Sequence, residues 1–272
     1  MAIVSRVPQT TRHQIRGIYH DERGQIIFID TPGIHQGKDR LDKLMNQSSF
    51  HAMEEVDCVI HLVDTSRRVG PEERMAVDRL KGLKAPVILG LNKMDLKGKF
   101  ADEYISLWQD MKGEAFHDTR SFVIFPLSGK TGRNVDQLVN IIFEFLPPGP
   151  MLYPDDMTSD VPQKIAMADI IREKLFELMK EEIPHALSVI VESAVPKPKK
   201  VLYILAHILV ERDSQKHIII GKKGQMLKKV GTLARQELEK LLDKKIYLDL
   251  QVKVEKNWRD DTDILKEMGY EI

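Results

Sequence analysis

Residues 86–95 read PVILGLNKMD, an apolar run that ends in the polar tetrapeptide Asn92-Lys93-Met94-Asp95. Two other stretches have the same form: QIIFID before Thr31-Pro32-Gly33, and FVIFPL before Ser128-Gly129-Lys130. Short runs of branched apolar residues are typical of buried strands, and open α/β sheets bind ligands beside the carboxyl ends of their strands. These three loops are therefore the first candidates for a binding site.

Apolar runs alternate with amphipathic segments through the first half of the chain. The pattern predicts a hairpin of two strands and then three further strands, each of the last three followed by a helix, so the fold class is α/β with a mostly parallel sheet. Pro71 suits a first helical turn, and Asn134 is expected to cap a helix. The expected strands are 14–19, 25–30, 58–64, 86–91 and 122–127, and the expected helices are 41–53, 71–83, 100–112 and 134–145.

Prolines crowd residues 146–162 and divide the chain. Their locked φ and missing N–H prevent a regular helix or central strand, so this segment is expected to be a linker. We expect one domain at residues 1–147, the linker at 148–165 and an α+β domain at 166–272. In the second domain the expected order is helix 168–181, strands 188–195 and 201–211, a helical stretch 215–242 broken at 221–224, and strand 245–254.

Composition bounds the function only weakly. Lys plus Arg and Asp plus Glu number 41 each, so net charge does not indicate a partner. The single cysteine cannot form an intrachain disulfide, and histidines and cysteine show no zinc-ligand spacing, so we expect no metal cluster. No apolar run would cross a membrane and no secretory signal opens the chain, which predicts a cytoplasmic protein.

Asp95 has the chemistry to read guanine. Guanine presents two adjacent donors, N1–H and its amine, and one carboxylate can accept from both. Asn92 can brace the loop, and the stem of Lys93 can lie over the ring plane. Alone, the tetrapeptide is equally compatible with a capped turn before a helix.

The loop at Asp30 suits phosphate and magnesium. An aspartate at a strand end can hold the water shell of Mg²⁺, and Gly33 lets a backbone N–H approach a terminal phosphate. Backbone N–H groups of the Ser128 loop could contact a base carbonyl. Each loop is a weak signal, but the three together in one alternating domain favour a GTP site.

Thr10 and Thr11 precede the hairpin. A threonine that reaches magnesium only when the terminal phosphate is present makes an order–disorder switch. The sequence does not distinguish the two threonines, and a simple turn before a strand explains them equally well.

The second half offers an RNA-binding pattern. Residues 214–236 contain no acidic residue and surround Gly221-Lys222-Lys223-Gly224, expected between two helices. A Gly-x-x-Gly loop lets an RNA backbone approach closely while neighbouring side chains supply positive charge. Apolar Ile218, Ile219, Ile220, Met226 and Leu227 are expected to form core and groove floor. The candidate RNA-binding residues are Lys216, Gly221, Lys222, Lys223, Gly224, Lys228 and Lys229.

These motifs together resemble the Era GTPases. The resemblance is carried by Gln9-Thr10-Thr11-Arg12, Asp30 to His35, Asn92 to Asp95, and Glu211 to Lys216 with the glycine loop, and it covers nearly the whole chain. It implies a Ras-like P-loop NTPase domain followed by a type II KH domain. It further implies GTP and Mg²⁺ as cofactors, slow hydrolysis, and binding of the 3′ end of small-subunit ribosomal RNA during maturation of the 30S particle.

Carried over by position, the resemblance assigns the site residues. Asp30, Thr31, Pro32 and Gly33 would serve phosphate and magnesium with Thr10 or Thr11. Ile34 stands where Ras-type proteins carry the glutamine that orients water, so water must be held by other means. Peripheral contact with the inner membrane is also attributed to the family, and we expect a monomer. The residues expected on the guanine side are Asn92, Lys93, Met94, Asp95, Ser128, Gly129 and Lys130.

One departure from the family is large. The 272 residues hold no Gly-x-x-x-x-Gly-Lys-Ser/Thr phosphate loop, and residues 2–5 match the segment directly after the family's first helix. We therefore expect the first strand, the P-loop and the first helix to be missing through a truncated frame, a fragment or a misplaced start. Two alternatives to a GTPase that binds RNA are then open: a KH-type RNA-binding module that no longer handles nucleotide, and a GTPase whose basic face contacts acidic lipids.

Overall fold

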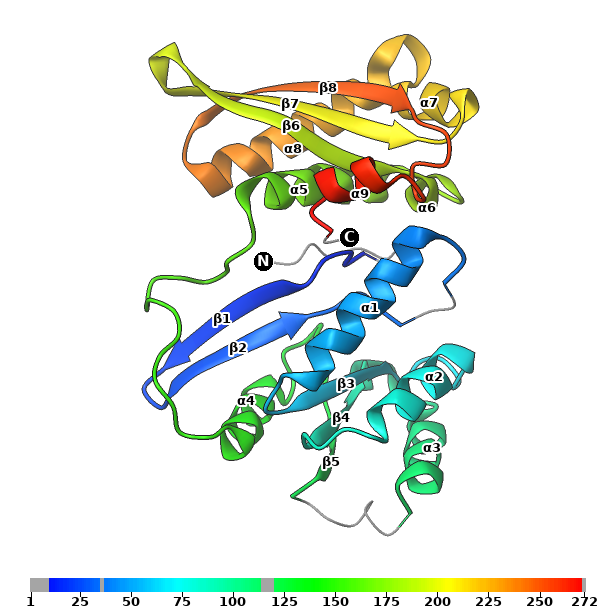
Figure 1. Ribbon diagram of the computed structural model, residues 1–272, viewed down its shortest axis with the longest axis vertical. Helices are drawn as coiled ribbons and strands as arrows, with labels where there is room; N and C mark the ends of the chain where they lie inside the picture. Colours follow the sequence, from blue (N-terminus) through cyan, green and yellow to red (C-terminus); the bar gives the residue numbers. More distant parts are fainter. Residues whose placement is uncertain (1–9, 35–36, 114–119, 271–272) are drawn as a thin grey trace.

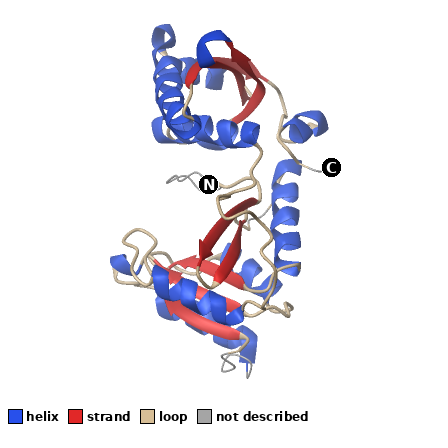
Figure 2. Cartoon of the chain, turned by 90° about the vertical axis from the view of Figure 1, so that its left-hand side faces the viewer, coloured by secondary structure: helices blue, strands red, loops and turns tan. Residues whose placement is uncertain are grey.

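The computed structural model describes residues 10–34, 37–113 and 120–270. The chain forms two lobes, with β1 to α4 in the lower lobe and α5 to β8 in the upper lobe (Figure 1). The view turned by 90° shows the same division, with a long helix beside the junction (Figure 2). The alternation of apolar runs and amphipathic segments thus gives an α/β lobe followed by a second, α+β lobe.

The strands of the first lobe form two separate sheets. β1 (Ile15–Asp21) and β2 (Gly24–Asp30) pair as the predicted antiparallel hairpin. β3 (Val59–Asp64), β4 (Val87–Asn92) and β5 (Phe122–Pro126) form a parallel sheet in that order. Parallel pairing brings the carboxyl ends of these three strands to one edge, where the register pairs Asp64 with Asn92 and Leu91 with Pro126.

Helices cover both faces of the parallel sheet. α2 (Pro71–Leu80) and α3 (Ala101–Lys112) pack on one face through a cluster that includes fully buried Trp108. α4 (Val135–Phe145) packs on the other face with Ile88 and Leu127. Pro71 lies in the first turn of α2 as predicted.

Asn134 does not cap α4 as predicted. It occupies the position before the helix but has a left-handed backbone, φ 61°, and its side chain caps no helical N–H. Its Nδ2 instead donates to the carbonyl of Pro126 at 2.8 Å, which fastens the start of α4 to the end of β5. The local propensity of asparagine for left-handed backbone explains the residue here.

The neighbouring edges of the two sheets are unpaired with each other. Among the described residues, β2 and β3 belong to different ladders, as expected if the central strand of a Ras-like sheet is not among these residues. Leu62 on β3 is 54% exposed, and its side chain lies against Gly90 on the next strand.

The proline-rich segment runs along the hairpin. Residues 146–162 contain no helix or ladder strand, but Ile18 N–H donates to Thr158 O at 2.9 Å and Arg16 pairs with Asp160 at 3.0 Å. α5 (Gln163–Leu178) begins five residues before the predicted helix, directly after Pro162. The segment ends at Pro162, three residues before the end predicted for the linker, and it is joined to β1 by this backbone bond and this ion pair.

The second lobe has the predicted order of helix, two strands, two helices and strand. Its sheet has the order β6-β7-β8, with β6 antiparallel and β8 parallel to β7, while α5 and α8 pack on one face. No helix in the described parts of the chain is long and apolar enough to cross a membrane. The remaining elements are α6 (Ile183–Ala186), β6 (Ser188–Lys197), η3 (Pro198–Lys200), β7 (Val201–Val210), α7 (Asp213–Ile220), η4 (Lys222–Gly224), α8 (Gln225–Leu242), β8 (Lys245–Val254) and α9 (Thr262–Glu267).

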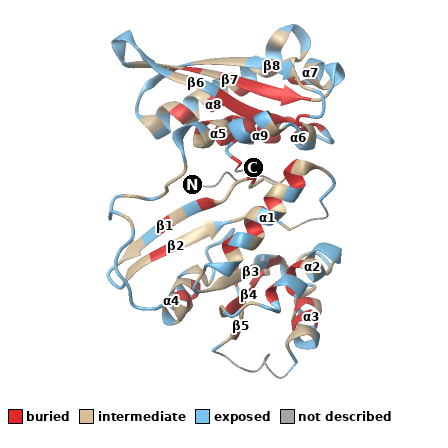
Figure 3. Cartoon of the chain, viewed as in Figure 1, coloured by how far each residue is buried: buried red, intermediate tan, exposed pale blue. Residues whose placement is uncertain are grey.

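A buried cluster joins the lobes. Leu41 and Met45 of α1 (Arg40–Glu54) pack with Trp258, Leu265 and Tyr270 from the end of the chain. Figure 3 shows buried segments on α1 and at the facing part of the upper lobe. α1 is thus packed against the second lobe, and Trp258 is fully buried in the contact.

Candidate functional site

Asn92 ties together the two loops expected to read a base. Asn92 ends β4, and its side-chain Oδ1 accepts from Lys93 N–H at 2.7 Å and from Gly129 N–H at 2.9 Å. The predicted bracing role is therefore present, and it extends to the loop after β5. Because parallel pairing already places both strand ends at one edge, a single amide suffices to hold the loops together.

Asp95 is oriented by Ser128. The hydroxyl of the fully buried Ser128 donates to Asp95 Oδ1 at 2.7 Å, while Asp95 itself is exposed. A carboxylate has about four lone-pair sites, so this bond leaves capacity for two further donors. The backbone N–H of Ser128 donates to Arg133 O, and that of Gly129 donates to Asn92 Oδ1. A base that accepted from either N–H group would therefore compete with an existing hydrogen bond. Lys130 follows as an exposed residue.

Asp64 is a site residue that the motifs in the sequence did not reveal. Lys93 has a left-handed backbone, φ 63°, and its Nζ pairs with Asp64 Oδ2 at 2.6 Å. Desolvation raises the pKa of Asp64, but hydrogen bonds from Lys93 and Ser66 outweigh it and lower that pKa to about 2. The signal was present in the sequence, because Asp64 is the one charged residue at the carboxyl end of the apolar run CVIHLVD.

Thr11 and Asp30 come together at the end of the hairpin. Thr11 Oγ1 donates to Asp30 Oδ2 at 2.9 Å, while Thr10 O accepts from Arg172 Nη2 at 2.6 Å. Asp30 is exposed in part, and partial desolvation raises the pKa of its carboxyl group. Hydrogen bonds from the Thr11 hydroxyl and the Thr31 N–H lower that pKa, but their effect is smaller. Of the two threonines left open by the sequence, Thr11 has a side chain that contacts the carboxylate.

The loop after Asp30 is fixed by α1. Pro32 is buried and its carbonyl accepts from Ser49 Oγ at 2.8 Å. Gly33 is exposed and Ile34 is half-buried, and His35 lies outside the described residues. The loop is therefore anchored at Pro32 on the helix that also packs against the second lobe.

The Thr10–Arg12 segment is bound to the second lobe. Arg12 is buried and its Nη1 donates to Leu187 O at 3.0 Å, while Tyr270 donates its hydroxyl to Arg12 O. Burial, together with nearby Arg172, lowers the pKa of Arg12 to about 9 and that of His13 to about 3. None of these contacts was signalled by the sequence, because each joins residues far apart in the chain.

The structure places the predicted residues in two groups. The guanine-side loops lie on the parallel sheet, and the Asp30 loop lies on the hairpin. Thr11 and Asp30 are hydrogen-bonded to each other in one group, and Asn92, Asp95, Ser128 and Gly129 are linked by hydrogen bonds in the other.

The glycine loop lies between α7 and α8 as predicted. Gly221 has φ 72° and ψ 175°, and Gly224 has φ 75°. A Cβ at Gly221 would come within 2.7 Å of the Met226 Cβ, so only glycine fits. Lys223 between them also has a left-handed backbone, φ 51°. The turn is therefore compact and carries its side chains outward.

The basic side chains around this loop are open to solvent. Ile219 is fully buried in the core, whereas Ile218 is 52% exposed, so of the two predicted roles only that of groove floor stays a prediction for Ile218. Successive residues of a helix lie about 100° apart around its axis, so the two side chains face different directions. His217 is exposed, and its Nδ1 lies 2.7 Å from Asp213 O. Lys216 is half-buried, and the exposed cations are Lys222, Lys223, Lys228 and Lys229.

Comparison with protein families matches both lobes. Residues 1–93 match the family described as 50S ribosome-binding GTPase, and residues 182–259 match the KH domain. Both matches agree with the motifs found in each half.

Two curated relatives match along nearly the whole chain. GTPase Era of Halothermothrix orenii is 42% identical over 99% of this chain and 90% of its own length. GTPase Era of Geobacter metallireducens is 46% identical over 99% of this chain and 89% of its own length.

Solved structures agree with the relatives. A variant of Aquifex aeolicus Era bound to GDP·AlF4⁻ superposes with TM-score 0.89 at 36% identity, over 100% of this chain and 91% of that one. Era in complex with MgGDPNP and nucleotides 1506–1542 of 16S ribosomal RNA superposes with TM-score 0.88 at 35% identity, over 100% and 90%. Loops, topology and likeness lead to one conclusion: this chain belongs to the Era family of GTPases.

Proposed function

We propose that this protein binds and hydrolyses GTP and binds the 3′ end of 16S ribosomal RNA during assembly of the small ribosomal subunit. The observation that carries the proposal is the braced pair of loops, Asn92 to Gly129 and Ser128 to Asp95, in the same chain as a glycine-hinged basic loop. The Era relative that was solved with MgGDPNP and 16S ribosomal RNA supports both ligands.

The residues present fit a guanine base. Asp95 would accept from N1–H and the exocyclic amine, and Asn92 and Ser128 would hold the carboxylate and the loops in place. The fixed acceptor gives specificity, because adenine lacks the matching pair of donors. If the aliphatic stem of Lys93 moved over the guanine ring, its Nζ would break or weaken the hydrogen bond that it donates to Asp64.

The residues present also fit magnesium. The hydroxyl of Thr11 and the carboxylate of Asp30 are hard oxygen donors in contact at 2.9 Å, which is the ligand class that Mg²⁺ prefers. A bound Mg²⁺ would neutralise charge on the phosphate oxygens. Gly33 would present its backbone to the terminal phosphate, and Ile34 offers no polar group to orient water.

The proposed RNA contact rests on Lys222 and Lys223. Replacement of both by aspartate should lower affinity for a 16S 3′-end RNA by at least about tenfold, because two phosphate contacts become repulsive. The matched control is Lys81→Asp with Lys84→Asp, two lysines of the first lobe that lie far from the glycine loop in the chain. Unchanged RNA affinity together with weaker binding to vesicles of acidic lipid would contradict the RNA assignment.

A second candidate function is a KH-type RNA-binding module that is inactive toward nucleotide. It is favoured by the absence of a Gly-x-x-x-x-Gly-Lys-Ser/Thr motif from the 272 residues, since that loop supplies most phosphate donors in the family. Loss of several charge-assisted bonds, at about 1.5–3 kcal/mol each, would remove useful affinity. Micromolar binding of GTP by the polypeptide of these 272 residues would exclude this candidate.

Three further features stay predictions. We propose a division into domains at residues 1–147 and 166–272 with the linker between them, a monomeric state, and a cytoplasmic location with peripheral contact to the inner membrane. An in-frame coding stretch for a phosphate loop directly upstream in the gene would favour the enzyme over the RNA-binding module.

A further inference from the structure

The outward face of the second sheet carries two stacked tyrosines. The register aligns Val195, Tyr203 and Tyr247 across β6, β7 and β8, on the face opposite the one that α5 and α8 cover. The two rings are 5.5 Å apart at their centroids and inclined by only 15°. Tyr247 is 61% exposed and Val195 is 44% exposed. An exposed aromatic pair on an open sheet has a free π-face.

Lysines surround this pair. The next row of the sheet pairs Lys197, Val201 and Lys245, and the Lys197 Nζ lies 5.8 Å from the Tyr203 ring centroid. Lys199 and Lys200 occupy the adjoining turn, with φ of 63° and 57°. All the lysines named here are exposed, as is Lys244 before β8. We call Tyr203, Tyr247 and these five lysines the tyrosine face.

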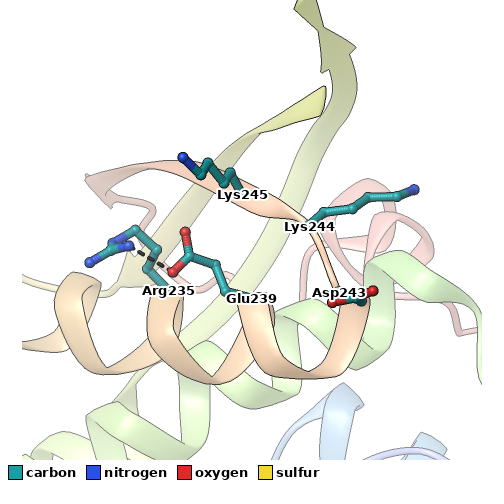
Figure 4. A pocket seen from close by; sticks show the side chains of 5 residues that line it. All are labelled: Arg235, Glu239, Asp243, Lys244 and Lys245. Atoms are coloured by element: carbon teal, nitrogen blue, oxygen red, sulfur yellow. Dashed lines mark hydrogen bonds and ion pairs between the residues drawn. The ribbon is translucent and has the colours of Figure 1, made fainter. Parts of the chain in front are cut away.

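Two acidic residues near the tyrosine face are engaged by other groups, and Asp243 is exposed beside Lys244. Asp249 accepts from Tyr203 OH at 2.9 Å, and Glu239 accepts from Arg235 at 2.8 Å and from Ile246 N–H at 3.0 Å. Figure 4 shows Lys244 and Lys245 extending away from Asp243 and Glu239 beside the hollow at the end of α8. Within the described part of the chain, none of the five lysines forms an ion pair. Their charges are available to a ligand.

We propose that the tyrosine face is a second RNA-binding surface, which takes an unpaired base on Tyr247 and the adjoining phosphates on the lysines. Single-stranded RNA is recognised by stacking of bases on aromatic side chains within a positive surface, and open sheets are a common platform for this. The exposed ring of Tyr247 and the unpaired lysines match single-stranded RNA better than they match a protein partner. The core of a protein–protein interface is typically apolar and poor in lysine, whereas five lysines surround these rings.

The tyrosine face is separate from the glycine loop. Gly224 precedes the first residue of α8, and Lys244 lies just beyond its last residue. The 18 residues of that helix span about 27 Å. In Figure 1 the β6–β7 turn and α7 lie at opposite ends of the sheet. One strand that occupied both sites would need several nucleotides between them, so the second site should act only on long RNAs.

The test compares two single-stranded RNAs by fluorescence anisotropy on the full chain. One strand has about 5 nucleotides, enough for a KH groove that clamps four, and the other has about 20 nucleotides. Tyr247→Ala should weaken binding of the long strand by about 5- to 100-fold, the range that loss of one base–aromatic stack causes, and leave the short strand unchanged. Tyr19→Ala, at a tyrosine 38% exposed in the first lobe, is the matched control.

A second variant reports stacking directly. Trp108 and Trp258 are fully buried, so in Tyr247→Trp the introduced indole is the solvent-exposed one among the residues described. Saturation with the long RNA should quench its fluorescence, and affinity should be kept. No quenching together with unchanged affinity in Tyr247→Ala would overturn the inference.

The same measurements separate this inference from the proposed function, on which it rests only for the class of ligand. Lys222→Asp with Lys223→Asp should remove binding of the short strand whether or not the tyrosine face binds RNA. If that double variant binds both RNAs normally, the proposed glycine-loop contact is wrong. If only the tyrosine variants are without effect, the proposed function stands and the tyrosine face does not bind RNA.

Discussion

Single side chains hold the nucleotide loops at the edge of the parallel sheet. Asn92 Oδ1 accepts from both Lys93 and Gly129, and Ser128 Oγ fixes Asp95. These contacts orient the carboxylate that we propose reads guanine before any ligand arrives, so binding need not order it. The bond from Lys93 to Asp64 adds a charge-assisted tether at the neighbouring strand end.

Two half-buried histidines should make the fold sensitive to acid. Burial lowers the pKa of His61 to about 4 and that of His13 to about 3, from 6.5 in both cases. Between pH 6.5 and 4 the unfolded chain therefore binds more protons than the native state, so the free energy of unfolding falls as pH falls. His61 alone should contribute roughly 1–3 kcal/mol across that window.

The measurement is urea unfolding of the wild type and His61→Asn at pH 7 and pH 4.5. Asparagine keeps an acceptor for Trp108 Nε1, which lies 3.2 Å from His61 Nδ1, but cannot titrate. The variant should lose less stability on acidification than the wild type. His51→Asn, at an exposed helical position, should lose as much as the wild type; equal losses in all three proteins would contradict the account.

At the scale of elements, periodicity predicted the strands well. β3, β4 and β5 each lie within an apolar run, because a parallel sheet covered on both faces requires one, and β1 follows the alternation expected of a half-buried strand. The prediction of the linker was less successful, since a proline directly before a helix is compatible with its first turn, and α5 begins after Pro162. The sequence did not reveal that Asn134 has a positive φ and caps no helical N–H, or that Ile218 is exposed. Both the φ angle and the exposure of a side chain depend on neighbours distant in the chain.

The candidate site was predictable to a similar degree. Motif chemistry located Asp95, Asn92 and the glycine loop, each within a few residues of a turn signal in the sequence. Asp64 and Arg12 were not identified, because their partners, Lys93 and Leu187, are distant in the chain. Contacts of that kind follow from the packing of lobes and strands, which no local pattern encodes.

Two glycines of the KH region should respond to alanine with opposite signs. Gly221→Ala should cost roughly 1–3 kcal/mol, because its φ and ψ of 72° and 175° are open almost only to glycine and the new Cβ would meet Met226. Gly231→Ala should stabilise by roughly 0.5–1 kcal/mol, because it lies inside α8 and its Cβ would make an ordinary 3.5 Å contact with Leu250. Urea midpoints measure both, and equal shifts in the same direction would refute the assigned loop geometry.

At the scale of the molecule, the two lobes are joined by polar and apolar contacts. Arg259 pairs with Asp39 and, at 3.1 Å, with Asp42 of α1, and its Nη1 donates to His185 O at 3.0 Å. Arg40 N–H donates to Asp260 at 2.8 Å. The same interface holds the Thr10–Arg12 segment, so the position of the second lobe and the order of that segment are linked.

Arg259→Ala should therefore destabilise the joined molecule by roughly 1–3 kcal/mol, since it leaves two largely buried carboxylates without their cation. Arg235→Ala is the matched control: it removes a more exposed pair with Glu239 one helical turn away and should cost about 0.5 kcal/mol or less. Unfolding followed by tryptophan fluorescence distinguishes them, because Trp258 lies in the interface. Equal losses would mean that the interface pair contributes no more than a surface pair.

The most direct test concerns guanine recognition by Asp95. In a chain extended with the phosphate-loop segment of an Era relative, Asp95→Asn should reverse the preference between GTP and xanthosine triphosphate. The amide would donate to the new carbonyl of xanthine, whereas it mismatches the guanine amine. Competition titrations of both nucleotides against the wild type and the variant measure this. The account predicts GTP selectivity in the wild type and xanthosine triphosphate selectivity in the variant, and an unchanged preference for GTP in Asp95→Asn would contradict it.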